Sequence, residues 1–261
     1  MIAHPQARAL GGGTDLYPSG QHGAGPLIDL TRVGGLRGVV TDGASIRIGA
    51  ATSWTDILDA PLPRAFDGLK QAARQVGSVQ IQNAGTIAGN LCNASPAADG
   101  APPLLTLNAQ VELMSAARGS RRLALEDFLK GVRHTALAPD ELMTAVIVPQ
   151  PPANMSSAFE KLGSRTHLVI SITMVAVAVA RDAAGAVTDV RIAAGSCAPV
   201  ARRLPDAEAA CLGRMPADVQ LQAAHFAPLT PIDDVRGPAA FRLHAVQEQC
   251  LRALTRACAD E

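Results

Sequence analysis

Aromatic side chains are scarce in this sequence of 261 residues, which has five phenylalanines, one tryptophan and one tyrosine. This scarcity argues against a ligand cage built of aromatic rings, and the core has to be made of Ala, Val, Leu and Ile. An excess of charge of one sign is lacking too, because 23 Lys and Arg balance 23 Asp and Glu. The balance argues against a nucleic-acid binder that depends on bulk electrostatic attraction. The length fits one domain or two.

Segments that would direct the chain to a membrane or out of the cell are also missing. The N-terminal residues 1–13 lack a cationic region followed by an apolar run of signal-peptide length. The longest apolar stretch, Leu168–Ala180, is well short of the roughly 18 to 20 residues of a membrane helix, and we interpret it as one or two buried strands. We therefore expect a cytoplasmic protein.

Motifs for metal binding and nucleophilic catalysis are absent from the sequence. No two of the five cysteines are spaced as CxxC, which argues against a zinc or iron–sulfur site in this chain and favours reduced thiols. The six histidines are scattered, and neither GxSxG nor HExxH occurs. We predict no catalytic side chain and no metal ligand.

The hydrophobic pattern predicts an α+β fold. Strands are expected at Pro26–Leu30, Ala44–Ala51, Leu104–Leu107, Val111–Met114, Met143–Val148, Ala158–Leu162, Ser171–Ala180 and Val187–Ala193. Helices are expected from Ser53 to Pro61, from Phe66 to Gly77, over Arg202–Leu212 and from Pro238 onward. Prolines at 149, 151 and 152 mark a linker. We predict a mixed domain over residues 1–153 and a smaller α+β domain over residues 154–261, with an antiparallel sheet and packed helices.

A run of three glycines, Gly11 to Gly13, follows the apolar pair Ala9-Leu10 and precedes Thr14 and Asp15. Successive glycines permit a positive φ and close approach, so backbone N–H groups there can converge on a phosphate oxygen. The run is neither a P-loop nor a GxGxxG motif. Taken alone, it is better explained as a tight turn between a strand and a helix.

The stretch Val79–Asn108 contains no Lys or Arg and a single acid, Asp99. Its centre, Gln80–Pro103, shows no periodicity, and we interpret it as a long ordered loop wrapped around a ligand. If that ligand is a pyrophosphate, N–H groups around Thr86 to Asn90 and side-chain amides would meet its charge in place of cations. Asp99 would suit ribityl or ribose hydroxyls, or else cap a helix or turn.

Together these segments resemble the FAD-binding flavoprotein subunit of the molybdenum hydroxylases, which has the p-cresol methylhydroxylase type (PCMH-type) fold. Residues 11–16 (GGGTDL) resemble the family's A-G-G-T-D-L, and residues 80–99 resemble Q-I-R-N-x-x-T-I-G-G-N-x-x-x-x-S-P-x-x-D. Further similar segments are DFLKGVRHT (127–135), PDELMTAVIVP (139–149), FEKLGSR (159–165) and DVRGPAAFR (234–242). The resemblance covers almost the whole chain, in order.

The resemblance implies a two-subdomain FAD-binding domain followed by the smaller C-terminal domain. It places the glycine loop and Thr86 to Asn90 at the FAD pyrophosphate, Asp99 at the ribityl chain, and Met143 and Lys161 near the ring, although Lys161 alone would be interpreted as a surface lysine. Val76 falls where the xanthine oxidoreductases of higher organisms place an aromatic residue over the ring. The cofactor-binding residues predicted in this way are Ala9, Leu10, Gly11, Gly12, Gly13, Thr14, Asp15, Leu16, Val76, Thr86, Ile87, Ala88, Gly89, Asn90, Asp99, Met143 and Lys161.

Two further departures from the family pattern bear on FAD affinity. Ala88 stands where the family has the first glycine of T-I-G-G-N, which adds a methyl group where backbone and phosphate approach closely. The region before Gly11 is shorter than in relatives, which carry another strand and helix there.

The resemblance implies an electron-transfer subunit of a heterotrimeric molybdenum hydroxylase. Molybdopterin and [2Fe-2S] clusters would belong to a large and a small partner subunit, and FAD on this chain would pass electrons to NAD⁺, a quinone, O₂ or another carrier. Two alternatives remain open at this point: a freestanding flavin oxidoreductase of the same fold, and a structural subunit that has lost FAD.

Overall fold

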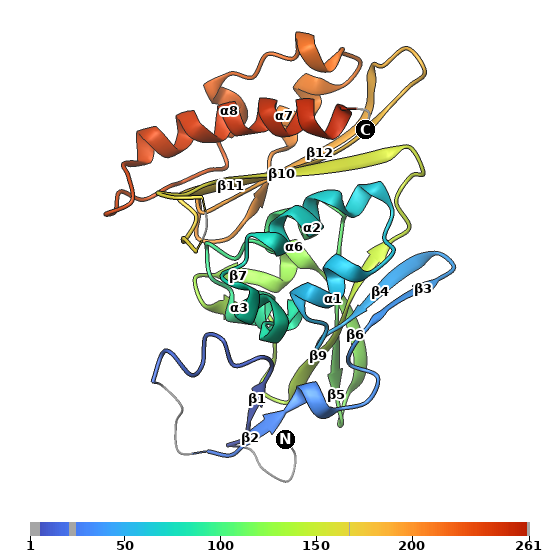
Figure 1. Cartoon of the computed structure of the whole chain (residues 1–261), viewed down its shortest axis with the longest axis vertical. Coiled ribbons are helices and arrows are strands. Elements are labelled where there is room, and N and C mark those ends of the chain that lie inside the picture. Colours follow the sequence, from blue (N-terminus) through green and yellow to red (C-terminus); the bar gives the residue numbers. More distant parts are fainter. Residues whose placement is uncertain (1–5, 21–24, 167, 260–261) are drawn as a thin grey trace. The chain divides into compact units, whose positions relative to one another are not determined.

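The computed structural model describes residues 6–20, 25–166 and 168–259. The chain forms two compact units, each assembled from three segments (Figure 1). The first unit comprises Met1–Ala60, Val76–Ser95 and Asn108–Gln150, and the second comprises Pro61–Gln75, Pro96–Leu107 and Pro151–Glu261. The predicted domain boundary between residues 153 and 154 stays a prediction.

An antiparallel sheet with the strand order β3-β4-β9-β5-β6 forms the centre of the first unit. Its strands are β3 (Val39–Asp42), β4 (Ser45–Gly49), β5 (Gln110–Ser115), β6 (Gly119–Ala124) and β9 (Glu141–Pro149). Ile46 and Ile48 of β4 pair with Val148 and Val146 of β9, and all four side chains are buried. The predicted strands around β4, β5 and β9 are confirmed, and β3 and β6 were not predicted.

Short helices with polar caps complete the first unit: α1 (Trp54–Asp59), α3 (Val79–Ala84), α4 (Ile87–Asn93) and α6 (Leu125–Phe128). Ser53, Ser78 and Thr86 cap α1, α3 and α4 by accepting a hydrogen bond from a first-turn N–H group. The unit also contains β1 (Arg8–Leu10) parallel to β2 (Leu27–Asp29), the 3₁₀ helix η1 (Leu30–Arg32), and β7 (Leu129–Gly131) paired with β8 (His134–Thr135).

The prediction of one long loop over Gln80–Pro103 is wrong, because α3, α4 and the start of α5 (Ala101–Thr106) fall inside it. Each of these helices has seven residues or fewer, about two turns at most, which is too short to establish a helical period in the sequence. The predicted strand Leu104–Leu107 is wrong as well. Three of its four residues are leucines because α5 is buried on all sides, and such a segment shows no helical period.

The second unit contains an antiparallel sheet with the order β10-β11-β12-β13. Its strands are β10 (Met155–Leu162), β11 (Thr173–Arg181), β12 (Val187–Gly195) and β13 (Arg202–Arg203). The predicted strands at β10 to β12 are confirmed. The helix expected over Arg202–Leu212 is shorter, since Arg202 and Arg203 belong to β13 and the helix α7 occupies Pro205–Cys211.

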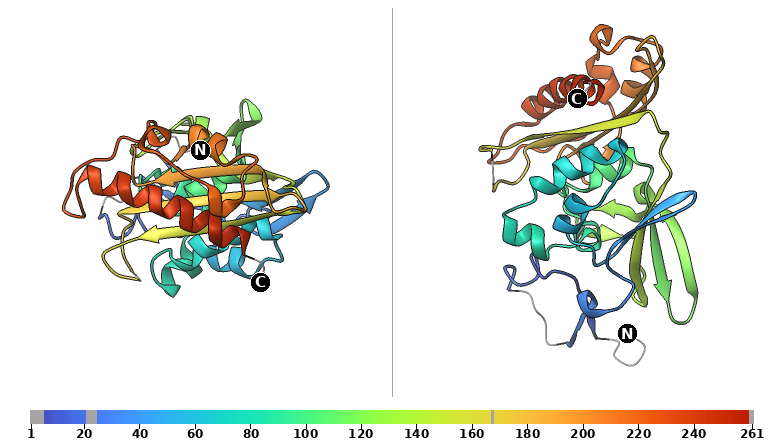
Figure 2. Two further views of the ribbon diagram at one scale, coloured as in Figure 1. Left: turned by 90° about the horizontal axis from the view of Figure 1, so that it is seen from above. Right: turned by 45° about the vertical axis from the view of Figure 1, so that its right-hand side comes forward.

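Both faces of this second sheet are covered. The long helix α8 (Ala239–Cys258) lies over the strands on one face, as Figure 2 (left) shows, and α2 (Asp67–Arg74) and α5 pack on the other. Val175, Val177 and Val179 pack with α8, and Met174 and Ala176 lie in a cluster with Ala72 of α2. Burial on both faces explains why β11 is an uninterrupted apolar run.

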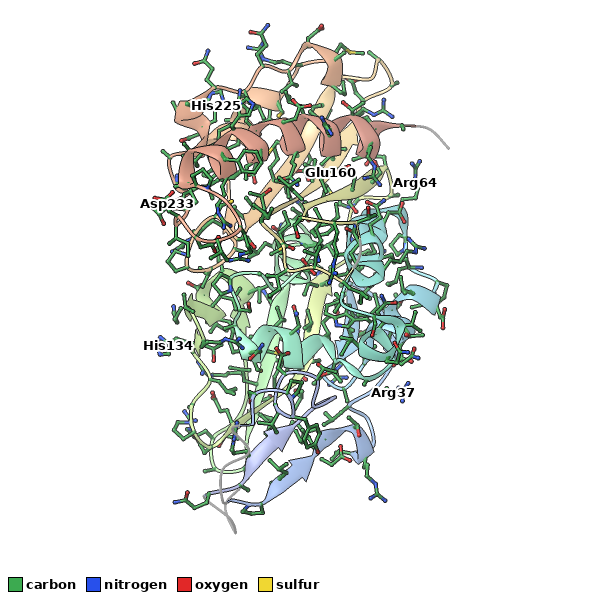
Figure 3. All side chains as sticks on the ribbon, turned by 60° about the vertical axis from the view of Figure 1, so that its left-hand side comes forward. Arg37, Arg64, His134, Glu160, His225 and Asp233 are labelled. Atoms are coloured by element: carbon green, nitrogen blue, oxygen red, sulfur yellow. The ribbon has the colours of Figure 1, made fainter. Side chains whose placement is uncertain are left out.

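The C-terminal end of α8 is tied to the rest of the second unit by polar contacts. Glu160 of β10, labelled in Figure 3, pairs with Arg256 of α8, and Arg64 donates to the carbonyl oxygen of Ala259. The unit also contains the 3₁₀ helices η2 (Arg64–Phe66), η3 (Pro216–Asp218) and η4 (Ala223–Phe226). No helix among the described residues is long and apolar enough to cross a membrane.

Candidate functional site

The first unit contains a cavity of about 730 Å³ at the carboxyl end of β1. Every residue from 8 to 16 lines it, together with Val76, Thr86, Gly89 and Asn90. An isolated bridge between Ser53 and Thr86, and a hydrogen bond from the N–H of Ile87 to the carbonyl oxygen of Thr52, hold the start of α4 in the wall. The fold therefore brings together the two segments that the sequence separates by about 70 residues.

The glycine run is required by the packing in this wall. A Cβ atom at Gly12 would lie 1.7 Å from the carbonyl oxygen of Ala84, and one at Gly11 would lie 2.7 Å from Oγ1 of Thr86. Gly13 has a φ of +71°, in the left-handed region, and a Cβ there would meet the ring of Tyr17 at 2.4 Å. Any larger side chain would close the wall or displace its backbone.

The backbone N–H groups of this run are open to a ligand. Across the part of the chain that the structure describes, the N–H groups of Gly11, Gly12, Gly13 and Thr14 have no hydrogen-bond acceptor. Four consecutive unpaired donors beside a cavity are the arrangement that binds phosphate oxygens in proteins.

The first N–H groups of α4 have hydrogen-bond acceptors within the protein. Those of Ile87 and Ala88 donate to the carbonyl oxygens of Thr52 and Ala50, and those of Gly89 and Asn90 donate to Oγ1 and the carbonyl oxygen of Thr86. These four amides have acceptors within the protein, and the assignment of Thr86 to Asn90 to a pyrophosphate stays a prediction. The glycine run supplies the open donors instead.

Asn90 has a side-chain oxygen that lacks a hydrogen-bond donor in the described part of the chain. Its Oδ1 is buried and has no donor among the described residues, although Asn90 lines the cavity. A buried amide oxygen without a donor is destabilising, and the hydroxyl group of a ligand would satisfy it. Open N–H donors and an orphaned acceptor in one cavity fit a ligand that carries both phosphates and hydroxyls, as FAD does.

Two arginines that the sequence reasoning did not single out also line the cavity, Arg8 and Arg133. The nearly uncharged stretch around α4 suggested a phosphate site without cations, but these cations come from other segments. Arg133, which has a φ of +57°, donates to Oδ1 of Asn93 at the end of α4. The family-like segment at 127–135 was the available signal for Arg133.

A smaller cavity of about 420 Å³ shares part of this wall, including Ala9, Gly11, Thr86 and Gly89. Ala88 and Met143 line only the smaller cavity. Cys92 lines both, and burial raises the pKa of its thiol to about 12, so the thiol is neutral at physiological pH. Both cavities are thus lined largely by small or uncharged groups.

Three predicted site residues lie elsewhere. Ile87 is fully buried in the core and lines neither cavity. Asp99 and Lys161 belong to the second unit, where Lys161 Nζ lies 2.7 Å from Oδ2 of Asp99. The side chain of Lys161 is only 5% exposed, which overturns its interpretation as a surface lysine.

The Asp99–Lys161 pair is held by further hydrogen bonds. Ser171 donates its hydroxyl to Oδ1 of Asp99 at 2.7 Å, and Lys161 donates to the carbonyl oxygen of Gln75 at 3.1 Å. Burial raises the pKa of Asp99, and the Lys161 ammonium and the Ser171 hydroxyl oppose that shift. Asp99 caps no helix, since Gly100 occupies the N-cap of α5 without a side-chain hydrogen bond.

Comparison with known proteins places these features in a family. Residues 1–151 match the model of the FAD binding domain in molybdopterin dehydrogenase, and residues 157–257 match that of the CO dehydrogenase flavoprotein C-terminal domain.

Three relatives illustrate the similarity. The chain is 31% identical over 271 residues to the xanthine dehydrogenase FAD-binding subunit of Escherichia coli O157:H7, covering 99% of this chain and 91% of that one. It is 42% identical over 166 residues to the nicotinate dehydrogenase FAD-subunit of Eubacterium barkeri, a match over 62% of this chain and only 56% of the relative. A crystallised carbon monoxide dehydrogenase from Hydrogenophaga pseudoflava that lacks the Mo-pyranopterin moiety superposes with a TM-score of 0.87 at 30% identity, covering 97% and 89% of the two chains.

Proposed function

Because this chain belongs to the family of FAD-binding subunits of molybdopterin-dependent dehydrogenases, we propose that it is the electron-transfer subunit of a heterotrimeric molybdenum hydroxylase. Substrate oxidation takes place on a large molybdopterin-binding subunit, and a small subunit with [2Fe-2S] clusters passes the electrons on. The terminal acceptor is NAD⁺, a quinone, O₂ or another carrier. The complex works in the cytoplasm.

The residues of this chain bind and orient the cofactor, and FAD when bound supplies the capacity to take up electrons singly and release them in pairs. The N–H groups of Gly11 to Thr14 hold the diphosphate, with Arg8 and Arg133 balancing its charge. Asn90 and Thr86 bind polar groups next to it. Asp99 and Lys161 are assigned to the ribityl chain and the ring through the family resemblance, as are Val76 over the ring and Met143 near it.

One observation carries this proposal. Four consecutive backbone N–H groups without an acceptor line the same cavity as a buried side-chain oxygen without a donor, within the described part of the chain. A ligand with phosphate oxygens and hydroxyl groups would pair with both kinds of group.

Titration of the purified full chain with FAD tests the proposal. We expect stoichiometric binding with visible flavin absorbance, and no turnover of xanthine-like or aldehyde substrates by the chain alone. Turnover by the isolated chain would favour a freestanding flavin oxidoreductase. A chain that takes up no FAD would be a structural subunit, and the proposal would fail.

Association with partners needs a separate measurement. Co-expression with the products of neighbouring reading frames, followed by size-exclusion chromatography, should yield a complex that contains molybdopterin and iron–sulfur clusters. Recovery of this chain as a lone species under those conditions would contradict the heterotrimer.

A further inference from the structure

The segment Asp234–Arg242 contains an ion cluster around a buried arginine, which FAD binding by the first unit does not explain. Arg242 on α8 has a side chain with no exposed surface, and its guanidinium donates to Oδ1 of Asp234 at 2.5 Å. It also donates to the carbonyl oxygens of Ile172 at 2.5 Å and Ser196 at 3.3 Å. A fully buried arginine is costly unless its donors are matched, so this cluster has a strict geometry.

Arg236 extends the cluster to the residue before Ile172. Asp234 and Gly237 exchange two backbone hydrogen bonds across a tight turn, directly after Asp233, which is labelled in Figure 3. Within the turn, Nε and Nη2 of Arg236 both bind Oδ2 of Asp234, at 3.1 and 2.7 Å. The remaining nitrogen, Nη1, donates to the carbonyl oxygen of Ser171 at 2.9 Å.

The two arginines therefore hold two consecutive carbonyl groups, those of Ser171 and Ile172, at the entrance to β11. These contacts fix the two peptide groups that directly follow the Ser171 side chain. Ser171 is a buried residue with 1% of its surface exposed, and its hydroxyl donates to Oδ1 of Asp99.

Asp99 in turn orients Lys161. Its other oxygen, Oδ2, accepts from the Lys161 ammonium at 2.7 Å, and Gln75 accepts a second N–H group of the same ammonium. An ammonium has three donors, and within the described residues these two acceptors leave one N–H direction of Lys161 for a ligand. That direction depends on the position of Asp99, and so on the hydroxyl of Ser171.

We infer that Ser171 is a positioning residue for the Asp99–Lys161 pair, and that Asp234, Arg236 and Arg242 form a clamp that holds Ser171 in place. The clamp gives a reason for the burial of Arg242, which lies far along the sequence from both Asp99 and Lys161. The inference rests on the proposed function in one respect only: the pair has to contact FAD for the clamp to influence the flavin.

The variant that tests the inference is Ser171→Ala, with Ser157→Ala as its matched control. Ser157 is a second buried serine of the same unit, and it bonds to Ala65 and Gly68, away from the pair. Both variants lose one buried hydroxyl, so both should lower the melting temperature to a similar extent.

The first measurement needs no cofactor. In ¹⁵N spectra of the full chain, the ammonium of a buried, paired lysine exchanges its protons slowly and gives an observable Nζ signal. We expect the Lys161 signal in the parent protein and in Ser157→Ala, and its loss or a large shift in Ser171→Ala. Arg236→Met, which releases the carbonyl of Ser171, should broaden it. An unchanged Lys161 signal in Ser171→Ala and in Arg236→Met would overturn the clamp.

The second measurement uses FAD. Ser171→Ala should raise the FAD dissociation constant about tenfold and shift the flavin midpoint potential, while Ser157→Ala changes neither. If the Lys161 signal moves and FAD affinity does not, the clamp stands and the assignment of the pair to the flavin fails. If the parent chain binds no FAD, the proposed function fails and the Nζ comparison alone decides the clamp.

Discussion

The glycine wall of the first unit and the Asp99–Lys161 pair of the second unit are polar regions built in opposite ways. The wall consists of Gly11 to Gly13 and Thr86, and it offers main-chain donors because side chains are absent. The pair consists of two buried charges that further side chains and carbonyls satisfy. Main-chain donors need no orientation by neighbours, whereas a flexible lysine has to be held. We therefore expect the wall to lose its ligand when a larger side chain replaces a glycine. The pair should be destabilised when one of its two charged residues is removed.

The largest effect is expected from Gly12→Val. The new Cβ would lie 1.7 Å from the Ala84 carbonyl oxygen, so the backbone has to move and the N–H groups of the run diverge. We expect FAD affinity to fall by about 100-fold or more. Gly34→Ala is the control, since a Cβ there meets nothing within 4 Å. Isothermal titration with FAD measures both, and normal affinity in Gly12→Val would show that the wall does not hold the diphosphate.

Breaking the pair should come next in size. Asp99→Ala leaves the Lys161 ammonium buried without its counter-ion, which costs about 3 to 5 kcal/mol in the free energy of unfolding. Adding Lys161→Met removes the stranded charge and should recover a large part of that loss. Urea unfolding of the single and double variants gives the coupling energy, and additive effects would mean that the two groups do not stabilise each other.

A smaller and more selective effect is expected from Asn90→Ala. The substitution removes a buried oxygen that lacks a donor among the described residues, so the cofactor-free protein should not lose stability. FAD affinity should fall about tenfold, because Asn90→Ala removes the oxygen that would accept a hydrogen bond from FAD. Thermal unfolding with and without FAD separates the two effects, and Asn83→Ala, at an exposed position, is the control. A clear loss of stability without FAD would contradict this role of Asn90.

The smallest effect is expected from the clamp at low pH. Hydrogen bonds from Arg236 lower the pKa of Asp234 from 3.8 to about 2 in the folded protein. A carboxylate with a lowered folded-state pKa stabilises the fold above its unfolded pKa and loses that contribution as the pH falls toward the folded value. The stability difference between the parent and Asp234→Asn should thus shrink between pH 4 and pH 2. A difference that stays constant over this interval, in urea unfolding at each pH, would contradict the lowered pKa.

Local patterns predicted much of the fold. Alternating Ile46 and Ile48, the cap at Ser53 and the apolar face of α8 each involve neighbours in the sequence, and the structure confirms the elements they indicated. The helices α3, α4 and α5 were missed because each is too short to display a period, and α5 is buried all around.

The candidate site divides in the same way. The glycine run, Thr86 and Asn90 were identified from the sequence, and all of them line one cavity. The sequence did not show that the carbonyl oxygens of Ala50 and Thr52 accept the N–H groups of Ala88 and Ile87, because that pairing depends on the fold. Arg8 was passed over because one arginine in a sequence carries no sign of what it faces.

The sequence by itself therefore determined the family, the α+β class and the glycine run, since each depends on residues close together in the chain or on a motif in a fixed order. Only the tertiary structure decided that Lys161 is buried, that Asp99 is its partner, and that Ser171 and Arg236 complete the network. These residues are 62 or more positions from Asp99. Their pairing follows from the low dielectric of the interior, where a charge must find a partner, and a sequence does not display which side chains the fold buries together.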